Sequence, residues 1–571
     1  MSHTLVDLEE QMKLAGENRA HRRMLKRSAP LMRCWKNQRN GQPGAVYAGR
    51  ANHRDVIEYE FPMKKNFSAT GRLKLRADHP IAKWVMRVPN TPQECKNVLI
   101  TVDLYGGRWR WSGLLHHWDL ETSDGADYLT LSFNDDLQFL QFMLAPPNPL
   151  LPIPIFQFPR EWPMFGPGAW CISTLILLQL IRIEGNLWTL PDDPFDLDQW
   201  FDIIQWGDWQ VHIKSPSFLF DNSLWVFLSS RMNTVDSVIA DALDDGQFSI
   251  EYRRIITDDG ESVRGLLDNN VANCALVFEV KDKSGWALPG GTFLGGTAAG
   301  GFIRTVLQWT DGFIGDTLEQ IGDNEALYPD EYWQTSFMGT FASAPAHCLR
   351  DSFWMDLQSK VTWSPATASS VIVGGDNPTA DAVIELIIKA TGNLLGYFLL
   401  GGFDSLGDIA ADVIMPFLTG TVLAWDQWEN SGRAQNLGWI HLWEIYQQGA
   451  EQNSWSLAAI GALRGGFVAT ESQTCHTLVV TDTNWFIPGL HGTIGDRMGS
   501  TSGALQRNAN LDVMFVNQIE EMSLRGDDTA NYEFLMKLGQ NKAAMSTGER
   551  LARMVKKFSE FLQGIGVRLT T

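Results

Sequence analysis

Residues 106–121 read GGRWRWSGLLHHWDLE, a run in which glycines frame alternating arginine and tryptophan and a histidine pair follows. Taken by itself, the stretch is compatible with a nucleic-acid platform, a metal site, a carbohydrate-binding face or a hairpin of a β-barrel. Alternation with a period of two is the pattern of a β-strand, whose successive side chains point to opposite faces. It predicts that Trp109 and Trp111 share one face and that Arg108 and Arg110 share the other.

The glycines Gly106, Gly107 and Gly113 suit a tight turn and a close corner between strands, because glycine leaves room for another backbone. We expect a hairpin whose tryptophans lie in the core or in a subunit interface and whose arginines are available to a neighbouring subunit. Metal binding by His116 and His117 is not expected, since adjacent strand residues point to opposite faces and cannot both ligate one ion. The stretch is therefore interpreted as structural.

The bulk composition indicates a globular, acidic, multidomain chain. Its 571 residues are too many for one core, so we expect three to five domains. Hydrophobic residues make up 44% and charged residues 20%, which excludes a disordered or fibrous chain. The formal net charge of −20 disfavours tight binding to a polyanion. Tryptophan occurs 23 times against 10 tyrosines, as in carbohydrate-binding proteins and in large β-rich assemblies.

The beginning of the chain concentrates basic residues in 21–39, after the acidic segment 6–11. We expect a terminal helix here that is either solvated or docked on an acidic partner surface. The six cysteines are scattered, which indicates folding in a reducing cytoplasm. No secretory leader and no unbroken transmembrane helix are expected, because the best candidate, 162–181, is interrupted by proline and glycine.

The first half of the chain reads as strands followed by helices. Residues 44–145 show short alternating runs that predict strands, although the last eleven have helical spacing. The proline-dense segment 145–168 predicts an extended connector and a domain boundary. Residues 169–245 favour helices, and 233–247 predicts an amphipathic helix with Val235, Val238, Ile239 and Leu243 on one face. A strand over 248–261 should end in an Asp-Asp-Gly turn.

The second half contains two unusual tracts. The glycine-rich tract 284–302 lacks the lysine of a phosphate-binding loop and is expected to be a loop or interface segment. The apolar region 378–425 is interrupted by charges, so it predicts either helices buried within an oligomer or a hairpin that touches a membrane. Strands are expected from about residue 475, and an amphipathic helix with a basic middle over 547–566.

The sequence offers no motif that supports catalysis, a cofactor or a metal ion. The zinc-protease pattern HExxH and the hydrolase pattern GxSxG are absent. Cys348 follows His347, but neighbours in sequence rarely meet as nucleophile and base. We therefore expect a protein that is not an enzyme.

Three stretches together resemble a known family. Residues 71–140 contain three segments in order: GRLKLRADHPIAKWV, VLITVDLYGGRWRWSGLLHHWDLE and DYLTLSFNDDLQFL. Their order, and the pattern of Gly107, Trp109 or Trp111, and Gly113, resemble the first barrel of the baseplate-hub superfamily of tailed phages. Residues 233–261 resemble the next domain of that family, and 480–499 the return of the chain into a second barrel. Length, tryptophan content and the apolar insertion are most similar to minor tail proteins of siphophages that infect mycobacteria and related actinobacteria.

The resemblance implies a fold, an assembly and a role. The fold would be multidomain α+β, with two β-barrel hub domains, intervening helical and α+β domains and a glycine-rich apolar insertion. Three chains would form a hub at the virion tail tip, synthesised in the host cytoplasm, that continues and closes the tail tube. Its partners would be the distal tail ring protein, the tape-measure protein and other minor tail proteins, with DNA present only in transit during genome release. An acidic channel lining would let DNA slide through.

Two alternatives remain open at this point. One is a cell-wall-directed enzyme or glycan-binding adhesin that uses the tryptophan-rich faces, and the other is a hub whose 378–425 segment inserts into the host membrane. The residues expected to contact a membrane in that case are Leu394, Leu395, Tyr397, Phe398, Leu399, Leu400, Phe403 and Phe417.

The sequence also predicts where the domains begin and end. The expected domain boundaries are 1–43 for a basic helical arm, 44–145 for the first barrel, 146–270 for the connector and a helical/α+β domain, 271–377 for a glycine-rich α+β segment, 378–470 for the apolar insertion and 471–571 for the second barrel and terminal helix.

Overall fold

The computed structural model describes most of the first half of the chain and separate parts of the second. Described are residues 28–38, 42–92, 94–123, 125–153, 162–188, 205–284, 297–299, 317–320, 347–351, 358–374, 425–446, 472–480, 486–509, 513–528 and 532–539, with a few isolated positions. The chain divides into two compact units. Unit 1 comprises Met1–Val361, Cys475–Gln540 and Ser546–Thr571, and unit 2 comprises Thr362–Thr474 and Asn541–Met545.

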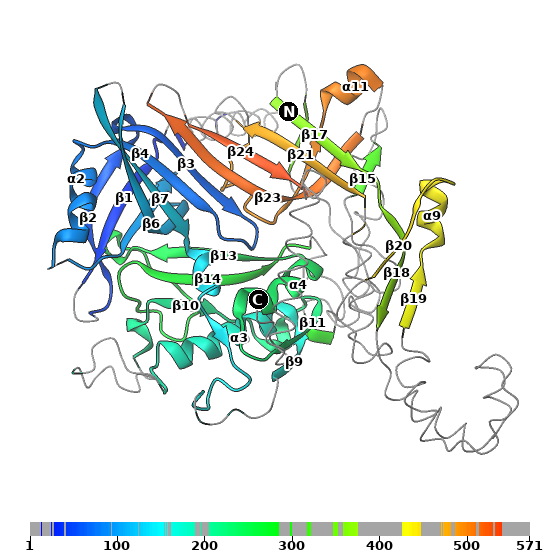
Figure 1. Cartoon of the computed structure of the whole chain (residues 1–571), viewed down its shortest axis with the longest axis horizontal. Coiled ribbons are helices and arrows are strands. Elements are labelled where there is room, and N and C mark those ends of the chain that lie inside the picture. The colour runs from blue at the N-terminus through cyan, green and yellow to red at the C-terminus, as the bar shows by residue number, and fades with distance from the viewer. Residues whose placement is uncertain are drawn as a thin grey trace, which may run out of the picture. The chain divides into compact units, whose positions relative to one another are not determined.

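A large, mainly antiparallel sheet dominates unit 1 (Figure 1). Its main path runs β17 (Gln358–Ser364), β21 (Gln473–Val480), β24 (Glu533–Leu538), β23 (Val513–Asp527), β3 (Val56–Lys64), β4 (Thr70–Arg76), β7 (Ala126–Asp135), β6 (Trp109–Ser123), β5 (Val98–Leu104), β1 (Leu31–Asn37) and β2 (Ala45–Asn52). Three more strands attach near β23, namely β15 (Thr317–Gln320), β22 (Arg497–Thr501) and β16 (Cys348–Leu349).

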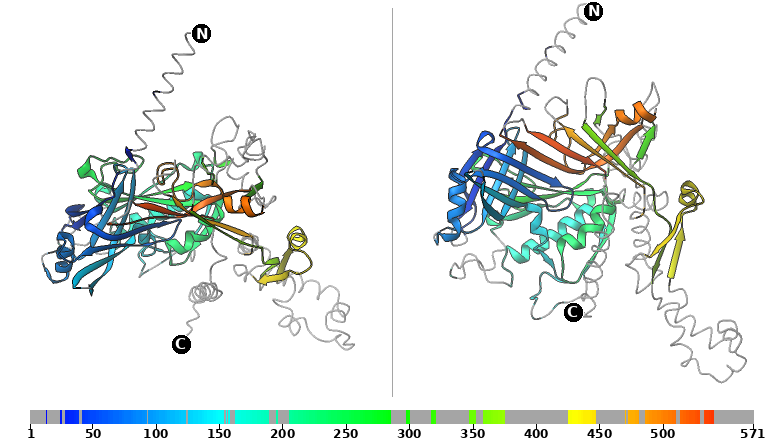
Figure 2. Two further views of the ribbon diagram at one scale, coloured as in Figure 1. Left: turned by 90° about the horizontal axis from the view of Figure 1, so that it is seen from above. Right: turned by 45° about the horizontal axis from the view of Figure 1, so that its top comes forward.

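The pairing of β23 with β3 joins the C-terminal strands to the N-terminal ones. Met522 lies opposite Met63 and Leu524 lies opposite Phe61, so segments more than 450 positions apart share one ladder. Both views in Figure 2 show the orange strands running beside the blue ones. The two regions read as separate barrels in the sequence therefore form one continuous sheet.

The sheet encloses one apolar core because its strands alternate as their sequences predict. In β4, Leu73 and Leu75 are buried while Arg72 and Arg76 point outward. The same core cluster contains residues of the N-terminal strands and of β21, β23 and β24. Trp109 of β6, for example, meets Phe534 of β24 in an edge-to-face contact with ring centroids 5.6 Å apart. Burial of this shared apolar surface is the main term that holds the two ends of the chain together.

A smaller α+β module of unit 1 packs beneath the sheet (Figure 1). Its sheet has the order β10 (Val211–Lys214), β14 (Ala275–Asp282) and β13 (Phe248–Ile255), covered by α3 (Gly168–Ile183) and α4 (Val235–Asp245). Two small ladders complete it, formed by β9 (Trp162–Pro167) with β11 (Trp225–Ser230) and by β8 (Leu144–Ala145) with β12 (Asn233–Thr234). Its apolar core is distinct from that of the large sheet.

Unit 2 contains a three-stranded sheet with the order β19 (Trp425–Glu429), β18 (Ala368–Gly374) and β20 (Leu442–Tyr446). The helix α9 (Ser431–Leu437) connects two of its strands and is capped by the Asn430 side chain. The remaining described elements of the chain are α2 (Pro80–Arg87), α11 (Gly503–Ala509) and the short 3-10 turns η1 (His53–Asp55), η2 (Val88–Asn90), η3 (Asp136–Leu140), η5 (Trp206–Asp208), η6 (Phe218–Phe220) and η7 (Thr257–Asp259).

Many local predictions are confirmed. Strands fill most of 44–145 and return after residue 475, so the mixed α+β class is confirmed. The amphipathic helix is α4, with Val235, Ile239 and Leu243 buried and Val238 packed at the edge of the module core. The strand after it is β13, which leads into η7 and a glycine with positive φ at Gly260. Among the described residues the strands form open sheets and not closed barrels.

Three local predictions are wrong. The helix expected over 21–39 gives way at Leu31–Asn37 to strand β1, because Met32 and Cys34 alternate inward against the core. The region 169–245 is only partly helical, since β10 and β11 interrupt it. The helical spacing over 135–145 yields only the 3-10 turn η3 and the two-residue strand β8.

The apolar region 378–425, with its eight residues proposed to contact a membrane, lies almost entirely outside the described residues, as do most of 284–302 and the terminal helix 547–566. Within the described parts, no helix is both long enough and apolar enough to cross a bilayer.

Gly113 of β6 is a test of close strand packing. A Cβ at this position would collide with the backbone carbonyl of Asn134 and approach the Trp111 ring to 2.9 Å. We expect Gly113→Ala to lower the free energy of unfolding by about 1–3 kcal/mol, since the backbone cannot yield. Gly49→Ala is the matched control, because its Cβ would make only an ordinary 3.4 Å contact with Ile81. Thermal unfolding of both variants measures the difference, and equal midpoints would refute the argument.

Candidate functional site

The stretch 106–121 lies where the large sheet meets the α+β module. Gly106 and Gly107 have φ values of 71° and 83°, and they form the tight turn between β5 and β6. Trp109 and Trp111 are buried, at 4% and 0% exposure, and their indoles lie in the core of the sheet. Trp111 donates from Nε1 to the Pro62 carbonyl at 2.9 Å. The tryptophans therefore occupy the first of their two predicted places, the core.

Arg110 points away from these rings and is also buried. Its guanidinium donates to Asp103 of β5, to both carboxylate oxygens of Glu261 at 2.7 and 3.0 Å, and to the Arg254 carbonyl at 2.6 Å. It is therefore used within the chain, and not held for a neighbouring subunit as the sequence suggested. Arg108 lies in the turn before the strand and is exposed, so its predicted role toward a neighbour stays a prediction.

A second arginine extends the same cluster. Arg33 of β1 donates to Asp103 and to Asp259 of η7, each at 2.6 Å. From the module, Arg253 donates to the Gly107 carbonyl at 2.6 Å and to Glu261 at 3.0 Å. The Gly107 carbonyl in the turn thus accepts a hydrogen bond from the module, and Arg110 after the turn binds the carboxylate of Glu261 in the module.

A separate buried pair lies beside it. Arg254 of β13 makes two hydrogen bonds to Asp136 of η3, at 2.9 and 2.7 Å, and a third to the Cys274 carbonyl. Ser112 of β6 donates to the same carboxylate. Two-point contact with a guanidinium fixes orientation as well as distance. We name this whole set the arginine seam, formed by Arg33, Arg110, Arg253 and Arg254 with Asp103, Asp136, Asp259 and Glu261.

The electrostatics of the seam favour the charged form of Glu261. Burial by itself would raise the pKa of Glu261, but hydrogen bonds from Arg110 and from the Ile256 N–H, together with the charges of Arg110 and Arg253, lower it below its usual value. Charges taken out of water require such compensation, because an unpaired buried ion is very unfavourable. The seam consequently positions the module on the sheet, with Glu261 as the anchor on the module side.

Asp135, next to the seam, has a pKa shifted in the opposite direction, upward. Burial raises its pKa to about 7, against hydrogen bonds from Ser68 and the Leu137 N–H that lower it. Its Oδ2 is buried without a hydrogen-bond partner. The folded protein therefore takes up a proton here near neutral pH, whereas the unfolded chain does so only near pH 4.

A third ionic contact ties the module to the C-terminal part of unit 1. Lys283, just after β14, donates to Asp496 at 2.6 Å and to Thr493 at 3.0 Å, and it pairs with Glu251 of β13 at 2.9 Å. The charges of Lys283 and Lys281 outweigh burial and lower the pKa of Glu251. The module is thus fixed to both the N-terminal and the C-terminal strands.

The histidine pair corrects the expectation that its members point to opposite faces. A bulge in β6 between Leu115 and His117 inserts His116 as an extra residue, and the two Nδ1 atoms lie 2.7 Å apart. Both rings are exposed. Among the described residues, no group of three or more His, Cys, Asp or Glu side chains is arranged to hold a metal ion.

The Cys348 thiol is unsuited to act as a nucleophile. Burial raises its pKa to about 11, whereas a reactive thiolate needs a lowered one. Its sulfur approaches Met514 at 3.3 Å, and the ring of the preceding His347 lies 5.5 Å from that of His491. Folding thus brings together two histidines that are separate in the sequence, but not as partners of the cysteine.

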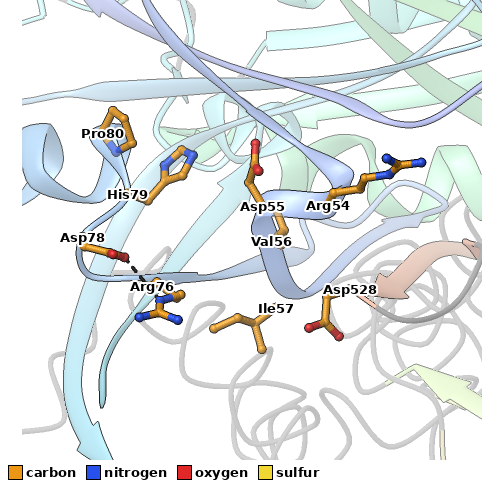
Figure 3. Close-up of a pocket in the computed structure, with 9 residues that line it drawn as sticks. All are labelled: Arg54, Asp55, Val56, Ile57, Arg76, Asp78, His79, Pro80 and Asp528. Carbon is orange, nitrogen blue, oxygen red and sulfur yellow. Dashed lines mark ion pairs between the residues drawn. The ribbon is translucent and has the colours of Figure 1, made fainter. Parts of the chain in front are cut away.

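A surface recess of about 410 Å³ lies near the start of β3 and α2 (Figure 3). Its lining residues are Arg54, Asp55, Val56, Ile57, Arg76, Asp78, His79, Pro80 and Asp528. Arg76 and Asp78 form an exposed pair at 3.4 Å, drawn as a dashed line in Figure 3, and His79 caps α2 by accepting from the Ile81 N–H. Arg76, Asp78 and His79 thus make local contacts at the start of α2.

We expect loss of the Arg110 charge to weaken the seam strongly. Arg110→Ala should lower the free energy of unfolding by about 3–5 kcal/mol, because it leaves the buried Asp103 and the partly buried Glu261 with fewer partners. Arg76→Ala, which removes an exposed pair, should cost at most about 1 kcal/mol. Urea unfolding followed by tryptophan fluorescence compares the two, and similar losses would contradict the role given to the seam.

Asp135 gives a prediction on pH. Since its folded pKa is raised to about 7, the folded state gains stability as pH falls from about 8 toward 4, and this contribution is lost as pH rises through 7. Asp135→Asn should remove that dependence and be at least as stable as the natural chain at pH 8. Asp119→Asn, at an exposed position, is the control. Thermal midpoints between pH 5 and 8 test this, and an unchanged slope in Asp135→Asn would count against it.

Comparisons with known proteins give the same assignment as the sequence resemblance. Minor tail protein Gp28 of Mycobacterium phage L5 is 29% identical over 520 residues, which cover 83% of this chain and 85% of that protein. Minor tail protein Gp28 of Mycobacterium phage D29 is 28% identical over 557 residues, covering 88% and 91%. The solved tail protein from Neisseria meningitidis MC58 aligns with 90% of this chain and 97% of its own, at 9% identity and a TM-score of 0.38.

The family model described as Siphovirus ReqiPepy6 Gp37-like protein matches residues 46–540. This match includes the stretch 106–121, the whole module and the strands β21 to β24. The resemblance to siphophage minor tail proteins is confirmed, and the chain belongs to the Siphovirus ReqiPepy6 Gp37-like family.

Proposed function

We propose that the chain is the structural hub of a siphophage tail tip. Three copies continue and close the tail tube and open to release the tape-measure protein and DNA. The main support for the proposal is the family match over residues 46–540. In addition, the chain aligns with two minor tail proteins over most of their length. Its neighbours in the virion would be the distal tail ring protein, the tape-measure protein and other minor tail proteins.

The open sheet of unit 1 supports assembly into a ring. Among the described strands, β2 ends the path and pairs only with β1; Ala45 at its start is bonded to Asn273, and no described strand pairs with the rest of its outer edge. Val46 and Tyr47 of β2 are also exposed. An unpaired strand edge is a template for pairing with another chain, and contacts between different faces of identical chains form a ring when the rotation between copies closes. The two barrels implied by the family would then be completed in the assembly, from the N-terminal strands and from β21 to β24.

The negative net charge of the chain is compatible with a channel through which DNA passes. A net charge of −20 repels DNA and disfavours its retention. The arginines of the seam are neutralised by carboxylates inside the chain, so they do not offer a site for phosphate. This supports DNA as a molecule in transit and not as a bound ligand.

Location in the virion is the decisive test. Negative-stain microscopy of virions labelled with an antibody to this chain should place the label at the tail tip, and averaged images should show three copies around the tail axis. Label on the capsid, or along the tail shaft, would refute the proposal.

Assembly in solution provides a second test. The full-length chain should form a species of three times 64.0 kDa in mass photometry. Val46→Lys should shift it toward the monomer, because a charge on a strand edge opposes pairing. Leu120→Lys, at an exposed position of β6, is the matched control and should leave the trimer unchanged. A monomer at every concentration, or a trimer that tolerates Val46→Lys, would contradict edge pairing through β2.

A further inference from the structure

The three-stranded sheet of unit 2 carries exposed tryptophans that the proposed hub function does not use. Trp428 of β19 is 64% exposed and Trp443 of β20 is 77% exposed. Tryptophan is among the largest apolar side chains, and clusters of exposed apolar residues mark interaction sites. We name these two residues the tryptophan shelf.

Strand register places both rings on one face of the sheet. Val371 of the central strand β18 lies opposite Trp428 on one side and opposite Ile445 on the other. Residues directly opposite each other share a face, and residues two apart in a strand share it as well. Trp443 is two residues from Ile445, so it stands on the same face as Trp428.

The shelf has a fixed spacing. β19 and β20 flank β18, and neighbouring strands lie about 4.8 Å apart, so the two tryptophans are about 10 Å apart across the sheet and, because Trp443 is two residues from Ile445, about 7 Å apart along the strands. Ser369 of β18 donates to the Trp443 carbonyl at 2.9 Å. On the opposite face, Gln427 donates to Ser370 at 3.0 Å and to Glu444 at 3.2 Å, which ties all three strands together.

We propose that the tryptophan shelf binds a neutral polysaccharide. The face of an indole ring is electron-rich, and it attracts the slightly positive C–H groups on the flat side of a sugar ring. Two rings held at a fixed separation on a sheet can stack against two sugars of one chain. Such a platform loses little conformational entropy on binding, because the strands are already ordered.

The charge around the shelf favours a neutral glycan over a lipid surface or an anionic polymer. On the face of the shelf, β19 contributes Asp426, whereas Glu429 and Glu444 lie on the opposite face; neither strand contains lysine or arginine. The nearby Arg433 of α9 is engaged with the Ala368 carbonyl and the Thr470 hydroxyl. Acidic surfaces are repelled by phosphate-rich headgroups, whereas attachment to such surfaces uses clusters of basic residues.

The test uses the purified full-length chain on immobilised neutral polysaccharides (a glucan, a galactan, an arabinan and chitin) and on liposomes of neutral and of anionic lipid. We expect binding to at least one polysaccharide and none to liposomes. Trp428→Ala and Trp443→Ala should each weaken binding about tenfold, and the double variant should abolish it. Trp428→Phe, which keeps an aromatic ring, should retain part of the affinity.

Trp188→Ala is the matched control, because it removes an exposed tryptophan from unit 1 and should leave binding unchanged. Circular dichroism verifies that each variant is folded, and mass photometry follows assembly separately. Failure of the shelf is therefore distinguishable from failure of the hub proposal. The inference is overturned if no polysaccharide binds, if the double variant binds as well as the natural chain, if Trp188→Ala loses binding equally, or if the shelf variants lose binding to liposomes instead.

Discussion

The buried guanidinium of Arg110 is the constraint around which unit 1 is arranged. A cation inside a protein is tolerated only where carboxylates and carbonyl oxygens surround it. Arg110 takes one carboxylate from the neighbouring strand, through Asp103, and the other from the module, through Glu261. Because Arg110 has both of its carboxylate partners only when the module packs against the sheet, the seam couples the two parts of unit 1.

Apolar burial and ion pairing make different contributions to this arrangement. The tryptophans on one side of β6 enter a core shared by the N-terminal and C-terminal strands, and this burial supplies most of the stabilisation. The arginine on the other side adds little net free energy, since desolvation offsets attraction, but it specifies which partner lies opposite. One face of β6 thus stabilises the sheet by apolar burial, and the other face fixes the orientation of the module.

Local features were predictable from the sequence, and the long-range pairing was not. Period-two alternation identified β6 and placed its tryptophans on one face, because that pattern depends only on adjacent residues. The partners of Arg110 could not be inferred, since Glu261 lies 151 positions away and nothing near either residue marks the pairing. The contact of His116 with His117 depends on a bulge, which shifts the register by one residue and leaves no simple signature in composition. Asp103, however, gave a usable signal, because a carboxylate inside the apolar run VLITVDL must either pair with a cation or take up a proton.

The composition of the seam also bears on movement. Separating an apolar joint exposes surface that water hydrates poorly, at about 25 cal/mol for each Å². Separating an ion-paired joint returns charges to water, and their hydration offsets much of the lost attraction. Under the proposed function, the hub holds a closed tube and later opens it, which would need contacts between its parts that fix position without strong cohesion. The arginine seam between sheet and module has this character, whereas the continuous β23–β3 ladder, with its apolar core, is the part of unit 1 least suited to separate.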